Sequence, residues 1–163
     1  MADFTDIVAE FSTIATAQSG ISSFKYGNPF EINESRTLAK PMFMLHKQRA
    51  VTYPNFDRKI KTFTLIFGIY DTYKESQKNT KEYADKQKDI ENLMEHFLRE
   101  FRKRSLGLTT EVTSPQSWFM PSGDLDTVTV EMIEVVGTDK LIGVEATISL
   151  SVFADCDTGT FSY

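Results

Sequence analysis

A strict alternation of apolar and polar residues near the end of the chain is the feature that most constrains its fold. From Ile142 to Val152 every second residue is apolar, and the residues between them include a glutamate, a threonine and two serines. Successive side chains of a strand point to opposite faces of its sheet, so this spacing predicts a long strand with one buried face. The rest of the chain has to supply elements that cover that face.

Residues 61–70 give a second clear strand, in which four apolar residues occupy alternate positions: Phe63, Leu65, Phe67 and Ile69. Gly68 within it indicates a bulge or close packing. Residues 42–45 are all apolar, which predicts a strand buried on both faces. The three remaining strands are expected at 22–26, 111–120 and 127–136. Pro115 breaks the second of these, which is therefore either an edge strand or a strand preceded by a loop.

Two helices are expected. Residues 4–15 have apolar side chains at three- and four-residue spacing, which predicts an amphipathic helix ending near Gly20. A much longer charged helix follows the strand at 61–70. Asn79 with Glu82 resembles a capping box at its start, and Gly107 can end it.

The element order is therefore α-β-β-β-α-β-β-β. We expect an α+β fold in which a mostly antiparallel sheet carries the N-terminal helix and the long helix on one face. Residues 1–153 fit one domain, and residues 154–163 form a polar C-terminal tail. Arg49–Arg58, around a Tyr-Pro-Asn sequence, is expected to be a flexible loop.

Charge and composition exclude several classes of protein. The formal net charge is −5, which argues against nucleic acid as a bound ligand, because phosphate binding needs a positive field. One cysteine cannot form an internal disulfide. The start of the chain is acidic where a signal peptide is basic, and no apolar run approaches the roughly 20 residues of a membrane helix. We expect a soluble protein, made in a cytoplasm and without a membrane partner.

Residues capable of chemistry are few and scattered. His46 and His96 are expected to be ordinary, partly buried imidazoles, because metal sites need three or four converging ligands. Cys156 lies between two aspartates, which disfavour a reactive thiolate. Glu145 is expected on an outward, solvated face. Four more carboxylates favour a solvated sheet face or a pore lining over a hydrolase pair: Asp124, Asp126, Glu131 and Glu134. We expect no enzymatic activity, no metal and no cofactor.

Aromatic residues outside the periodic segments are candidates for partner contacts. Trp118 and Phe119 precede a Pro-Ser-Gly turn, and the alternative for Trp118 is that it caps the core. Phe161 and Tyr163 lie in the polar tail, where an interaction is favoured.

Three segments carry a resemblance to a known family. They are 26–33, beginning Tyr-Gly-Asn-Pro; 40–44, Lys-Pro-Met-Phe-Met; and 67–71, Phe-Gly-Ile-Tyr-Asp, followed by 74–76. With the element order, size and acidity, they resemble the tail-terminator, or tail-completion, proteins of tailed bacteriophages.

The resemblance implies a structural virion protein at the tail–neck junction, made in the host bacterial cytoplasm. Subunits of this family form a ring, commonly a hexamer, that ends the tail tube and meets neck and head-connector proteins, while DNA passes without specific binding. We expect neighbour contacts from the loop residues Arg49, Tyr53, Phe56 and Arg58 and from the C-terminal tail. Asp124 and Asp126 are expected to face the lumen, since a negative wall lets DNA slide.

Three alternatives stay open: another neck or head-completion ring subunit, a cytoplasmic dimeric binding module, and an enzyme whose site forms between subunits. Oligomeric state separates a ring from a dimer. A deep pocket with converging polar groups would favour the enzyme.

Overall fold

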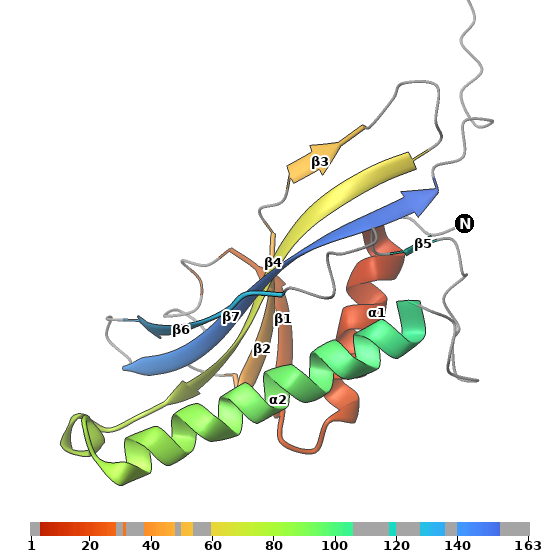
Figure 1. Ribbon diagram of the computed structural model, residues 1–163. Coiled ribbons are helices and arrows are strands. Elements are labelled where there is room, and N and C mark those ends of the chain that lie inside the picture. Colours follow the sequence, from red (N-terminus) through yellow and green to blue (C-terminus); the bar gives the residue numbers. More distant parts are fainter. Residues whose placement is uncertain are drawn as a thin grey trace, which may run out of the picture.

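The computed structural model describes residues 4–28, 31, 38–47, 50–53, 60–105, 118–119, 128–135 and 140–153. These residues form two α-helices, a 3-10 helix and a seven-stranded sheet, which confirms the α+β class (Figure 1). The order is α1 (Phe4–Ala17), β1 (Ser23–Gly27), β2 (Met42–His46), β3 (Ala50–Thr52), β4 (Ile60–Thr72), η2 (Glu75–Gln77), α2 (Lys81–Ser105), β5 (Trp118–Phe119), β6 (Val130–Val135) and β7 (Leu141–Phe153).

Two long central strands organise the sheet. β4 and β7 have 13 residues each and pair antiparallel along their whole length, with Ile60 opposite Phe153 and Thr72 opposite Leu141. β2 and β3 both flank the free side of β4, while β5 and β6 flank the free side of β7. β1 lies outside β2 and pairs with it in parallel; the other pairings of the described strands are antiparallel.

Strand β3 was not expected, because Arg49–Arg58 had the pattern of a flexible loop. Ala50–Thr52 instead pairs with Thr62–Thr64 of β4. β2 pairs only with Phe67–Tyr70 of β4. The backbone N–H and C=O groups of the earlier part of β4 therefore need another hydrogen-bond partner on that side. The order is thus α-β-β-β-β-α-β-β-β, with one strand more than expected.

Both helices pack on one face of the sheet, as predicted. Phe11 of α1 lies at the centre, with its ring centroid 5.0–6.2 Å from four other rings: Phe43, Phe67, Phe97 and Phe101. The alternating apolar residues of β4 are buried against these helices, and so are those of β7 from Ile142 to Leu150. β2 is buried on both faces, as its apolar run predicted. Neither described helix is long and apolar enough to cross a membrane.

The start of α2 differs from the expected capping box. Thr80 accepts a hydrogen bond from the backbone N–H of Tyr83 at 3.4 Å, so Thr80 caps the helix. Asn79 takes a left-handed conformation with φ of 62°, which an asparagine tolerates well. Glu82 accepts a hydrogen bond from the Gln77 side chain at 3.0 Å. The predicted N-cap was one residue too early, because Asn79 and Thr80 are neighbours and both residue types are good N-caps.

Candidate functional site

A buried polar cluster lies on the sheet face opposite the helices. It combines His46 of β2, Tyr70 of β4 and Glu145 of β7. The Tyr70 hydroxyl donates a hydrogen bond to Glu145 Oε1 at 2.5 Å. His46 Nε2 lies 3.0 Å from the Tyr70 hydroxyl and 3.5 Å from Glu145 Oε1. His46 and Tyr70 are buried, and only Glu145 reaches solvent. The cluster links three neighbouring strands through their side chains.

Two glycines make room for the Tyr70 ring. Gly143 stands directly opposite Tyr70, and a Cβ there would lie 2.5 Å from Cδ1 of the ring. A Cβ at Gly68 would lie 2.5 Å from the Tyr70 hydroxyl oxygen. The ring therefore lies across the bare backbone of both central strands, an arrangement in which an aromatic side chain covers strand glycines. Gly68 is thus explained by close packing, one of the two interpretations of the sequence, and not by a bulge.

The surroundings of the cluster shift the pKa values of His46 and Tyr70. Burial lowers the pKa of His46, against the opposing effect of the Glu145 charge. Burial and the hydrogen bond to Glu145 raise the pKa of Tyr70 well above its usual range. Tyr70 thus stays a neutral hydrogen-bond donor to Glu145. This arrangement stabilises the packing of three strands, and it corrects the expectation that Glu145 stands on a solvated face.

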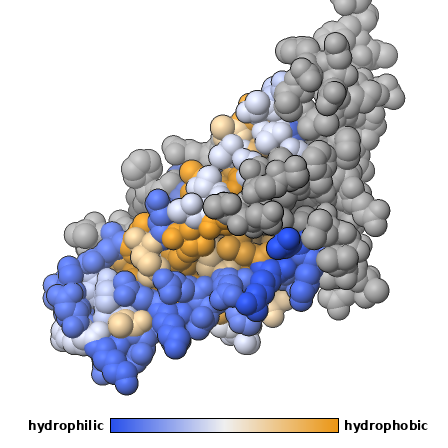
Figure 2. Space-filling model, viewed as in Figure 1, coloured by the Kyte–Doolittle hydropathy of each residue, from blue (hydrophilic) through white to orange (hydrophobic). Residues whose placement is uncertain are grey.

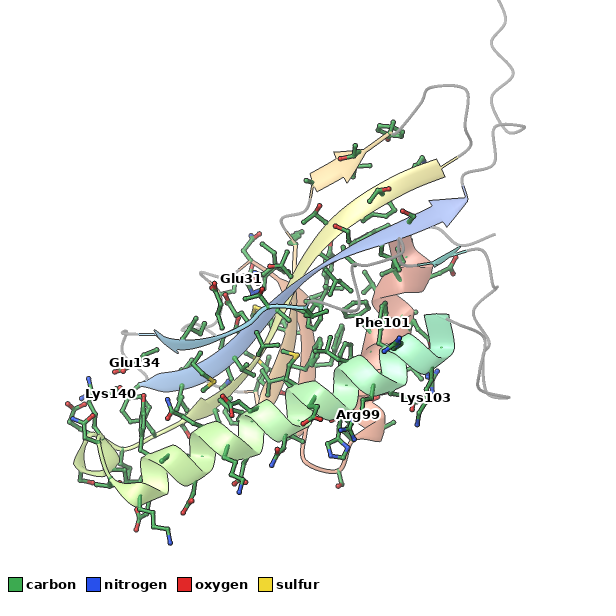
Figure 3. All side chains as sticks on the ribbon, viewed as in Figure 1. Glu31, Arg99, Phe101, Lys103, Glu134 and Lys140 are labelled. Carbon is green, nitrogen blue, oxygen red and sulfur yellow. The ribbon has the colours of Figure 1, made fainter. Side chains whose placement is uncertain are left out.

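A second polar cluster gathers around Glu134 of β6. Glu134 accepts hydrogen bonds from Tyr73 at 2.5 Å, Lys78 at 2.9 Å and Tyr83 at 3.3 Å. The Tyr73 hydroxyl, followed by the Lys78 ammonium, lowers the pKa of Glu134, and the same bond raises the pKa of Tyr73 to about 12. Figure 3 shows Glu134 and Lys140 at one end of the sheet, beside the start of α2. Glu134 therefore joins β6 to η2 and α2, while remaining exposed as expected.

Metal binding has little support in the described part of the chain. No group of three or more His, Cys, Asp or Glu side chains there is placed to hold a metal ion. His96 is exposed on α2, which corrects the expectation that it is partly buried. The absence of a cofactor stays a prediction for the chain as a whole.

Four strands pair with a single neighbour among the described residues: β1, β3, β5 and β6. Of these, β3 and β6 lie on opposite sides of the central β4–β7 pair. β3 pairs only with β4, and β6 only with β7. The large hydrophobic side chains that are exposed in the described residues all belong to these edges: Val51 (38%), Tyr53 (57%) and Val130 (39%). Lys61 Nζ lies 5.9 Å from the centroid of the Tyr53 ring. Figure 2 shows apolar side chains gathered beside the hydrophilic band of α2.

The expected contact residues are only partly described. Tyr53 is exposed beside the open edge of β3, where a neighbour can reach it. Trp118 and Phe119 form strand β5, which pairs with Val152 and Ser151 of β7. The other expected contact and lumen residues lie outside the described residues: Arg49, Phe56, Arg58, Asp124, Asp126, Phe161 and Tyr163.

Sequence reasoning did not identify Val51 or Val130 as exposed. Val51 lies in a three-residue strand, too short for a period to show. Val130 is in phase with Val128 and Met132, which pack against the core, so the alternation predicts that it points inward. No protein-family model and no curated protein matches the chain.

Proposed function

We propose that the protein is a structural subunit of a tailed bacteriophage virion, located at the tail–neck junction. Copies of it form a ring, with a hexamer favoured, that ends the tail tube and joins it to the neck and head-connector proteins. DNA passes through the centre without specific binding. The observation that carries this proposal is the pair of open, apolar sheet edges on opposite sides of the subunit.

Open edges support assembly because an uncovered strand is a liability for a protein that works alone. Its unpaired N–H and C=O groups offer a template for another chain, and exposed valines and tyrosines strengthen that tendency. Two different edges on opposite sides allow head-to-tail contacts, and such contacts close into a ring when the rotation between neighbours permits. The polar clusters support the same view, since His46, Tyr70 and Glu145 bind one another.

The charge of the subunit fits a passage for DNA. A net charge of −5 disfavours adhesion of the phosphate backbone to the ring. Asp124 and Asp126 are the proposed lumen-facing acids. Replacing both with lysine is expected to slow DNA ejection without preventing assembly, and unchanged ejection kinetics would exclude this role for the two acids.

Negative-stain microscopy of the purified protein, with light scattering for its mass, tests the proposal. Closed rings of about six copies with a central hole are the expected result. A stable dimer without a hole would contradict the proposal and favour a cytoplasmic binding module. Antibody labelling of assembled particles then distinguishes the tail end from another neck or head-completion position.

A further inference from the structure

We infer that neighbouring subunits join by pairing the open edge of β6 in one copy with the open edge of β3 in the next. The inference rests on the proposed ring and names the contact that builds it. The partner is a second copy of this chain, and the two edges differ in charge, so each recognises the other and not itself.

The sequence segments that contain the two edge strands carry opposite charges, and their described charged residues agree: Lys47 and Lys61 near β3 are basic, while Glu131 and Glu134 of β6 are acidic. The segment 47–61, which contains β3, has five basic residues and one acidic residue, for a net charge of +4. The segment 124–134, which leads into β6, has four acidic residues and no basic residue, for a net charge of −4. Lys47 and Glu131 are exposed members of these two segments. In a chain with a net charge of −5, this opposition attracts unlike edges and repels like ones.

Strand direction also fits the pairing. β3 and β7 both run antiparallel to β4, and β6 runs antiparallel to β7. β6 therefore runs opposite to β3 within one subunit. Subunits related by rotation about a ring axis keep the same orientation, so β6 of one copy meets β3 of the next as an antiparallel pair. This is the commoner arrangement for strands without a crossover between them.

The exposed hydrophobic side chains meet on the same face. Val51 stands opposite Phe63, and Val130 stands opposite Ala146. Phe63 and Ala146 both face the core beneath the helices, so Val51, Tyr53 and Val130 all lie on the helix-bearing side. Joining the two edges brings these side chains together and removes apolar surface from water.

A two-fold dimer uses these edges less well. Pairing β3 with β3 would place two basic segments together, and pairing β6 with β6 would place two acidic ones together. Like charges across an interface oppose binding. Either dimer would also leave the other edge, with its exposed hydrophobic residues, in water.

Charge reversal at single edges tests the contact. The double variant K47E/K61E reverses charge beside β3, and E131K reverses charge on β6. Each is expected to raise the dissociation constant of the assembly by about tenfold or more, as judged by sedimentation velocity. The triple variant K47E/K61E/E131K has both edges reversed and is expected to recover association. K88E, on the exposed side of α2, is the matched control and should assemble like the wild type.

The outcomes separate this inference from the proposed function. Wild-type rings that persist unchanged in both single-edge variants would overturn the β6–β3 contact and leave the ring itself intact. If the single-edge variants lose their rings and the triple variant does not restore them, the β6–β3 contact is also overturned. Circular dichroism of each variant distinguishes this outcome from a failure to fold. A wild-type chain that stays monomeric at every concentration and on isolated tail tubes would overturn both.

Discussion

Arg104 of α2 and Glu10 of α1 form a 2.6 Å ion pair, in which the side chains are only 6% and 3% exposed. Arg104 also contacts Glu100 at 3.2 Å on its own helix. The two helices are thus joined by charge as well as by the phenylalanine core between them. Figure 3 shows the neighbouring basic residues Arg99 and Lys103 on the outer side of the same helix.

Removing the negative charge of this buried pair should destabilise the fold. We expect Glu10→Gln to lower the free energy of unfolding by about 2–3 kcal/mol, because it removes the negative charge from an ion pair whose two side chains are almost fully buried. Urea denaturation measures the change. Glu95→Gln is the matched control: it breaks the exposed pair of Glu95 with Arg99, where a loss of less than about 1 kcal/mol is expected. Equal losses in the two variants would contradict the structural role of the buried pair.

The glycines beneath Tyr70 give a second prediction. Gly143→Ala should cost about 1–3 kcal/mol of stability, since its Cβ would overlap the rigid ring of Tyr70. Gly20→Ala is the control, because its Cβ would meet only the flexible end of Leu93. In a Tyr70→Ala background the cost of Gly143→Ala should largely disappear. Additive losses in that double-mutant cycle would show that the ring is not what excludes a side chain there.

His46 should make stability depend on pH on the acid side. Burial lowers its pKa in the folded protein below the ordinary value of 6.5, while the unfolded chain keeps that value. The unfolded state therefore takes up a proton first, and stability falls as the pH drops below 6.5 towards the folded pKa. Thermal melts between about pH 7 and about pH 5 should show a shallower slope for His46→Gln than for the wild type. His96→Gln removes an exposed histidine and should leave the His46 contribution in place.

Tyr73 should make stability depend on pH on the alkaline side. Its bond to Glu134 raises the folded pKa from 10.0 to about 12, so the unfolded state loses its proton first. The stabilisation is fully present below pH 10 and is lost as the pH rises towards 12. Melting temperatures measured across this range should fall less for Tyr73→Phe than for the wild type. If the two curves run parallel, the short bond does not contribute to stability.

The periodic parts of the chain were predictable, because a period reports which side of an element is buried. The alternation at 61–70 and 142–152 correctly gave the two central strands and their core-facing residues. The alternation could not reveal which side chains cover the opposite face of the sheet. Glu145 was therefore expected to be solvated, although Tyr70 and His46 lie against its carboxylate. Nor could any local pattern pair Glu10 with Arg104, which are 94 residues apart.

The positions of β3 and β6 along the sheet have a consequence for the shape of an assembly. The middle of β3 is level with Leu150 of β7, whereas β6 is centred near Gly143 and Val144. Copies joined β6 to β3 are thus displaced along their strands by six to seven residues, or roughly 20 Å. One repeat across β3, β4, β7 and β6 is about 19 Å wide. A flat ring accommodates both lengths only if its strands tilt by about 45° from the axis, which makes it a continuous sheared barrel. Without that tilt the same contact winds into an open helical filament.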